Sequence, residues 1–120
     1  MHIGLKNSKN NYIRFFAEEF KIRNEKLRTI KPPPTFSWND DVFGCGLIYP
    51  PTNINELPYV FFTQNGKQIG KAILSKDNCD SYKPYVVLLC CSVETNFGNN
   101  LHSKPFIYDI SKHFVPKEFY

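Results

Sequence analysis

The sequence predicts an all-β fold in which short antiparallel strands pack as a sandwich. Aromatic residues make up 16% of the 120 residues, and apolar residues make up 42%; aromatic side chains are enriched in strands. Asn65-Gly66 separates two strand-like runs. This is the strongest short-range signal of a β-hairpin, because both central residues of a type I′ turn need positive φ. Short strand-like runs then recur along the chain with turn residues between them, as they do in sandwich domains.

The segment 12–22 is ambiguous. Its residues Ile13, Phe16 and Phe20 have the spacing of one helical face. Two short strands, at 12–16 and 20–23, with a turn at 17–19 between them fit the same residues. Taken by itself, the segment slightly favours a helix.

The other elements are predicted from apolar runs bounded by proline, glycine and polar residues. Strands are expected at Val42–Tyr49, 59–64, 67–74, Tyr85–Leu89, 93–97 and Phe106–Ile110. Turns or loops are expected at 6–11, 39–41, 50–58, 75–84 and 99–104, and the tail from 111 to 120 is expected to pack only in part. Tyr85–Leu89 is apolar on both faces, which is typical of a central strand.

Charge and the absence of long apolar runs narrow the class of protein. The formal net charge of +4 is mild, and solubility explains it without a nucleic-acid partner. The basic cluster between Lys21 and Lys31 is predicted to be a solvated edge or loop. The longest apolar run, Tyr85–Cys91, is much shorter than the roughly 20 residues that a membrane helix needs, so no membrane association is expected.

The cysteines and histidines indicate no catalytic or metal site. Cys45, Cys79, Cys90 and Cys91 have no zinc-ligand spacing, and Cys45 is predicted to lie in the core. No base or electropositive pocket can be assigned to a nucleophilic cysteine, and the histidines stand in no metal-binding motif. The sequence shows no signal peptide and no glycosylation acceptor, which favours a cytoplasmic or nuclear location. We therefore expect no enzyme, no cofactor and no metal.

Five segments in the second half of the chain resemble, in order, the SPRY domain, the core of the B30.2 module. Asp41–Leu47 is similar to the family's Asp-Val-Ile-Gly-Cys-Gly strand, and Phe61–Gly70 is similar to its Phe-Phe-Thr-Lys-Asn-Gly-Lys-x-Leu-Gly hairpin. Lys83–Leu88 stands where the family has Tyr-Pro-Thr-Val-Gly-Leu. Val93–Gly98 matches Val-x-x-Asn-Phe-Gly, and Pro105–Asp109 matches Pro-Phe-x-Phe-Asp. Upstream, His2–Leu5 and Glu19–Asn24 resemble family strands more weakly.

The resemblance implies an antiparallel β-sandwich of the concanavalin-like jelly-roll type, with strands rather than a helix between residues 12 and 24. The family's opening strands, with their Tyr-Tyr/Phe-Glu-Val segment, have no counterpart here. We therefore expect residues 1–112 to form a partial SPRY domain, incomplete at its N-terminus, and residues 113–120 to form a C-terminal tail.

The resemblance also implies a protein-binding module. Family members bind an extended peptide or a loop of a partner protein through surface loops, often as ubiquitin-ligase adaptors or scaffolds. Carried over by position, the candidate partner-binding residues are Tyr12, beside the loop at 6–11, and Leu89, Cys90, Cys91 and Ser92 in the shortened connection before Val93. Tyr12 is alternatively a core aromatic.

Two other functions stay open. The chain is alternatively a small basic β domain that binds single-stranded nucleic acid through Lys21–Lys31 and nearby aromatic residues, because interleaved basic and aromatic side chains can neutralise phosphates and stack on bases. It is also conceivable as a truncated fragment without independent function.

Overall fold

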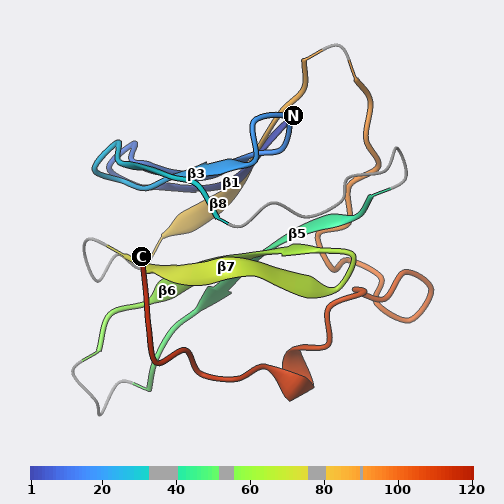
Figure 1. Ribbon diagram of the computed structural model, residues 1–120. Coiled ribbons are helices and arrows are strands. Elements are labelled where there is room, and N and C mark those ends of the chain that lie inside the picture. Colours follow the sequence, from blue (N-terminus) through green and yellow to red (C-terminus); the bar gives the residue numbers. More distant parts are fainter. Residues whose placement is uncertain (33–40, 52–55, 76–80, 90) are drawn as a thin grey trace.

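Alternation of apolar and polar side chains gives the larger sheet one apolar face, which packs against one of the two apolar faces of the smaller sheet. The computed structural model describes residues 1–32, 41–51, 56–75, 81–89 and 91–120. It is a sandwich of two antiparallel sheets (Figure 1), with strand orders β4-β3-β2-β1-β8 in the larger sheet and β5-β6-β7 in the smaller sheet. The predicted all-β sandwich is confirmed.

The strands are short, as the sequence suggests. The larger sheet contains β1 (His2–Asn7), β2 (Tyr12–Phe16), β3 (Lys21–Arg23), β4 (Thr29–Ile30) and β8 (Tyr82–Val87), and the smaller sheet contains β5 (Phe43–Ile48), β6 (Tyr59–Gln64) and β7 (Lys67–Leu74). One 3₁₀ helix, η1 (Ile110–Lys112), follows in the described part of the chain. The expected features at 39–41, 50–58 and 75–84 lie partly outside the described residues.

The core lies between the two sheets. The larger sheet contributes the fully buried Ile13, Phe15 and Ile22, and the smaller sheet contributes Val60 and Phe62 among others. The rings of Phe15 and Phe62 meet across the interface with their centroids 5.7 Å apart. Aromatic pairs at this separation add to the free energy gained by burying their area.

The predicted hairpin is confirmed at 59–64 and 67–74. Asn65 and Gly66 have φ angles of 51° and 81°, as the two central residues of a type I′ turn require. Asp41 holds the neighbouring strand to this turn, because its carboxylate accepts hydrogen bonds from Gln64 Nε2 at 3.0 Å and Asn65 Nδ2 at 2.9 Å. The adjacent strand β5 confirms the prediction for Val42–Tyr49.

The helix that segment 12–22 slightly favours is wrong. Within β2, Ile13 and Phe15 are fully buried, whereas Tyr12 and Arg14 are half-buried on the opposite face. This period of two is that of a strand. Phe20 lies in the turn between β2 and β3 with a φ of 49°, so its helical spacing from Ile13 is coincidental. The strands implied by the SPRY resemblance are confirmed here.

The strands predicted at 93–97 and 106–110 are wrong, because side chains there bind the local backbone instead of leaving it to a neighbouring strand. Asn96 donates from Nδ2 to the Lys104 carbonyl at 2.8 Å, and its Oδ1 accepts from the Gly98 amide at 3.0 Å. Asp109 Oδ1 accepts from the Ser111 amide at 3.0 Å and so caps η1.

Two predictions about burial are also wrong. The strand predicted at Tyr85–Leu89 is β8, which ends at Val87 and lies at the edge of the larger sheet rather than at its centre. It contains Pro84, which lacks an amide proton and is therefore suited to an edge strand. Cys45 as a residue is exposed, because it lies on β5, an edge strand of the smaller sheet, although burial raises the pKa of its thiol to about 12.

The C-terminal segment covers the outer face of the smaller sheet. Tyr59, Phe61 and Ala72 on this face are buried, and Tyr108 and Phe119 pack against them. Figure 1 shows the segment running along the sheet on the side away from β1 and β3. The smaller sheet is thus packed on both of its faces by the chain itself.

His113 anchors this segment. Its ring stacks on Phe61 with the centroids 4.6 Å apart. Its Nε2 shares a hydrogen bond of 2.9 Å with the Tyr59 hydroxyl, and its Nδ1 shares one with the Tyr108 hydroxyl. Burial lowers the pKa of His113, which favours the neutral ring in this position. Phe114, by contrast, is 89% exposed, so the tail packs only in part, as expected.

Candidate functional site

The outer face of the larger sheet gathers basic and aromatic side chains. Directly paired residues of antiparallel strands present their side chains on the same face. The pairs on this face run across β8, β1, β2 and β3 and include Lys6 with Tyr12 and Arg14 with Arg23. We call it the basic–aromatic face; it comprises His2, Lys6, Tyr12, Arg14, Phe16, Lys21, Arg23, Lys83 and Tyr85.

Aromatic rings hold the guanidinium groups of this face in place. Arg14 Cζ lies 5.0 Å from the ring centroid of Tyr12, 5.4 Å from that of Phe16 and 5.9 Å from that of Tyr85. Arg23 Cζ lies 5.4 Å from the Phe16 centroid, and the rings of Tyr12 and Tyr85 meet edge-on at 4.9 Å. Cation–π contacts of this kind fix a guanidinium group without neutralising its charge.

Among the residues that the structure describes, most cations of the face form no ion pair with a carboxylate. Within the described part of the chain, Lys21 pairs with Glu19, and this contact lowers the pKa of the Glu19 carboxyl. Arg14 and Arg23 have no ion pair among the described residues, and the Nε–H of each is buried without a hydrogen-bond partner. A buried donor without a hydrogen-bond partner lowers the free energy of unfolding by about 1–3 kcal/mol. The face therefore has unused donors and uncompensated positive charge.

The structure places Tyr12 on this face, half-buried, and not in the core. Leu89, Cys91 and Ser92 are exposed on the chain that leaves β8, and Cys90 lies outside the described residues. Tyr12 is level with Lys83, because both pair with Lys6. Leu89 lies beyond Val87, the last residue of β8, and Val87 is about 13 Å along the strand from Lys83. The structure therefore does not bring Tyr12 and Leu89 together.

Sequence reasoning missed Arg14, Lys83 and Tyr85 as neighbours of Tyr12. The available signal was the period-two alternation Tyr12-x-Arg14-x-Phe16, followed by Lys21-x-Arg23. The basic cluster from 21 to 31 is divided, since Lys21 and Arg23 lie on β3, whereas the intervening basic residues Lys26 and Arg28 are exposed in the following turn.

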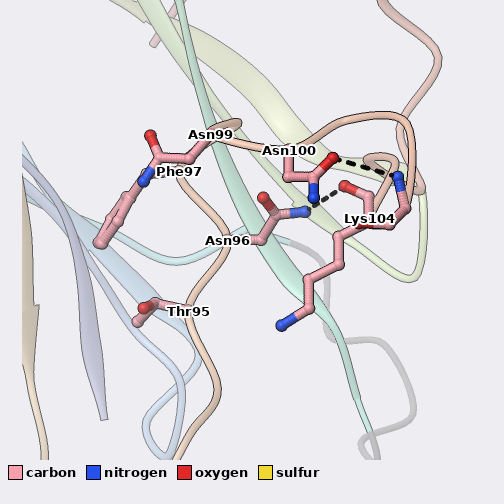
Figure 2. A pocket seen from close by; sticks show the side chains of 7 residues that line it. Thr95, Asn96, Phe97, Asn99, Asn100 and Lys104 are labelled. Carbon is pink, nitrogen blue, oxygen red and sulfur yellow. Dashed lines mark hydrogen bonds between the residues drawn. The ribbon is translucent and has the colours of Figure 1, made fainter.

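A cavity of about 330 Å³ lies in the loop at 95–104 (Figure 2). The side-chain amide of Asn96 in this cavity bonds to the backbone of the same loop. Figure 2 shows Asn96 turned toward the Lys104 carbonyl, to which it donates a hydrogen bond of 2.8 Å. The Lys104 ammonium pairs with Glu94 at 2.6 Å.

A second cavity, of about 310 Å³, lies beside Glu25, Ser75 and Tyr120. There Tyr82 donates to Glu25 Oε1 at 3.0 Å, which links β8 to the turn after β3.

Neither metal binding nor membrane insertion gains support from the described residues. No group of three or more histidine, cysteine, aspartate or glutamate side chains is gathered there in a way that could hold a metal ion. None of the helices among them is long and apolar enough to cross a membrane. The basic–aromatic face thus remains the strongest candidate site.

Comparisons with models of protein families, with curated proteins and with solved structures found no match to this chain. The resemblance to the SPRY domain therefore rests on the sequence motifs alone.

Proposed function

We propose that the chain is a non-catalytic protein-binding module of the SPRY type, which recognises a peptide or loop of a partner protein through the basic–aromatic face. The observation that carries this proposal is the difference between the two outer faces. Tyr59 and Phe61 on the smaller sheet are buried under the C-terminal segment, whereas Tyr12 and Arg14 on the larger sheet keep part of their surface exposed. A role as a ubiquitin-ligase adaptor or scaffold follows from the SPRY resemblance only.

The side chains of the face suit recognition. Arginine and tyrosine are enriched among the residues that dominate binding free energy. Tyr12 and Arg14 already contact each other, so they lose little further rotamer freedom when a partner binds. No serine or cysteine lies on the face to act as a nucleophile, and the proposal therefore contains no catalytic step.

The size of the face suits a short segment of a partner. Four strands spaced about 4.8 Å apart, of which the longest are roughly 20 Å long, give an area of at most about 300 Å². A standard interface between folded proteins buries about 800 Å² on each side. A peptide or a loop fits the smaller area. The free thiols of Cys45 and Cys91 support a reducing cytoplasmic or nuclear location.

A photo-crosslinking residue at position 12 tests the proposal. We expect the Tyr12→benzoylphenylalanine variant to form a covalent adduct with a discrete protein in cell extract, and peptide mapping to place the adduct within one short segment of that protein. The same residue at Gln68, which is exposed on β7 of the smaller sheet, is the matched control. Equal adducts at both positions, or none at position 12, would contradict the proposed function.

A further inference from the structure

We propose that the partner segment is acidic, with carboxylates at alternate positions of an extended peptide that lies across the basic–aromatic face. This inference rests on the proposed function and names the chemistry of its partner. Three observations support it: the net positive charge of the face, the donors of its arginine side chains, and the spacing of its cations along the strands.

The face accounts for the whole net charge of the chain. Its five cations, Lys6, Arg14, Lys21, Arg23 and Lys83, are opposed by Glu19 at its margin. With 15 basic and 11 acidic residues in the sequence, basic and acidic residues are equal in number elsewhere. Attraction of an acidic segment is therefore directed to this face.

Like charges stand directly opposite each other on neighbouring strands. Arg14 pairs with Arg23 across β2 and β3, and Lys6 pairs with Lys83 across β1 and β8. Like charges in this position destabilise a sheet. A carboxylate that binds between the two members of a pair offsets the repulsion.

The donors match carboxylate geometry. The Nε–H groups of Arg14 and Arg23 are buried, so a carboxylate would reach these guanidinium groups through their Nη donors, two of which can bind one carboxylate in parallel. Lys6 is level with Tyr12, two positions from Arg14 on β2, and this step is about 7 Å along a strand. Alternate side chains of an extended peptide have the same spacing.

The rings favour a peptide over single-stranded nucleic acid. Bases need open aromatic faces on which to stack. Phe16 is only 7% exposed and has the cationic groups of Arg14, Lys21 and Arg23 within 5.4 Å of its ring centroid. Arg14 also lies over Tyr12. The face therefore presents positive charge rather than open stacking surfaces.

Binding of synthetic probes tests the inference. The probes are a fluorescent peptide of about ten residues with alternating glutamate and threonine, long enough to cross the face, its lysine–threonine counterpart, and an oligothymidylate of similar length. We expect the glutamate peptide to bind in a salt-dependent manner and the lysine peptide not to bind. The double variant Lys6→Glu, Lys83→Glu should weaken binding of the glutamate peptide at least about tenfold, since it turns two attractions into repulsions.

The control double variant is Lys67→Glu, Lys117→Glu, which makes the same change of charge at exposed positions outside the face. It should leave the affinity within about twofold, because exposed charges are screened over roughly 10 Å. A thermal melt of each variant establishes that it is folded before its binding is compared.

Three results would overturn the inference: no binding of the glutamate peptide, equal loss in the control variant, or tighter binding of the oligothymidylate than of the peptide. The last result would assign the face to nucleic acid. These outcomes are distinct from failure of the proposed function. A defined adduct at position 12 within a segment that lacks acidic residues leaves the protein-binding function standing and removes only the acidic partner.

Discussion

Phe15→Ala lowers the free energy of unfolding by about 3–5 kcal/mol, the range for removing a buried phenylalanine from a core. Phe15 is fully buried. Its ring centroid lies 5.7 Å from that of Phe62 in the opposite sheet, and 5.3 Å and 5.6 Å from those of Phe20 and Phe43. The substitution therefore removes the aromatic contact between the two sheets. Urea denaturation followed by circular dichroism measures the loss as a lower midpoint at an unchanged slope.

Phe114→Ala is the matched control, because it deletes the same group from a side chain that is 89% exposed. Surface substitutions of this kind usually stay within about 0.5 kcal/mol. If the two substitutions reduce stability equally, the core does not lie between the sheets where Phe15 and Phe62 meet.

Gly46→Val destabilises the protein by about 1–3 kcal/mol, the usual effect of inserting atoms into a packed region, and loosens the C-terminal segment. A Cβ at position 46 would lie 2.2 Å from Phe61 Cζ, so the Phe61 ring has to move. That ring is buried and stacks on His113 with the centroids 4.6 Å apart. Valine favours strands more than glycine does, so a loss of stability must come from the displaced ring.

Urea denaturation and limited proteolysis of the C-terminal segment measure the two effects of Gly46→Val. The control is Cys45→Val, which introduces the same side chain at the adjacent position of β5, on the sheet face opposite Phe61, because Cys45 pairs with Phe62. We expect faster cleavage between His113 and Tyr120 in Gly46→Val and not in Cys45→Val. Equal stability and equal cleavage of the two variants would contradict the packing of Phe61 beneath His113.

The sheets could be predicted from the sequence where the determinants are local. The hairpin at Asn65-Gly66 depends on two adjacent residues with positive φ, and both β5 and β6 are bounded by turn or proline residues. The segments 93–97 and 106–110 could not be predicted in this way. Their apolar residues fit strands, but Asn96 and Asp109 bind the nearby backbone instead.

The candidate site was predictable only in part. Tyr12 was predicted as a binding residue from its position in the SPRY resemblance. The side chains that surround it depend in part on the register between β1 and β8, which are distant in sequence. Gly4 of β1 pairs with Tyr85 of β8, and no local pattern specifies that partner. The same limit explains why the core position predicted for Cys45 was wrong, since the edge of a sheet is a property of the whole topology.

The most direct test of the basic–aromatic face as the recognition surface is the ¹H–¹⁵N spectrum of the arginine Nε–Hε groups during titration with the glutamate–threonine peptide. The chain has three arginines: Arg14 and Arg23 lie on the face, and Arg28 is exposed in the turn after β3, where it serves as an internal control. We predict that the signals of Arg14 and Arg23 shift to saturation while that of Arg28 stays in place. Unmoved signals of Arg14 and Arg23, or an equal shift of Arg28, would contradict the assignment of recognition to this face.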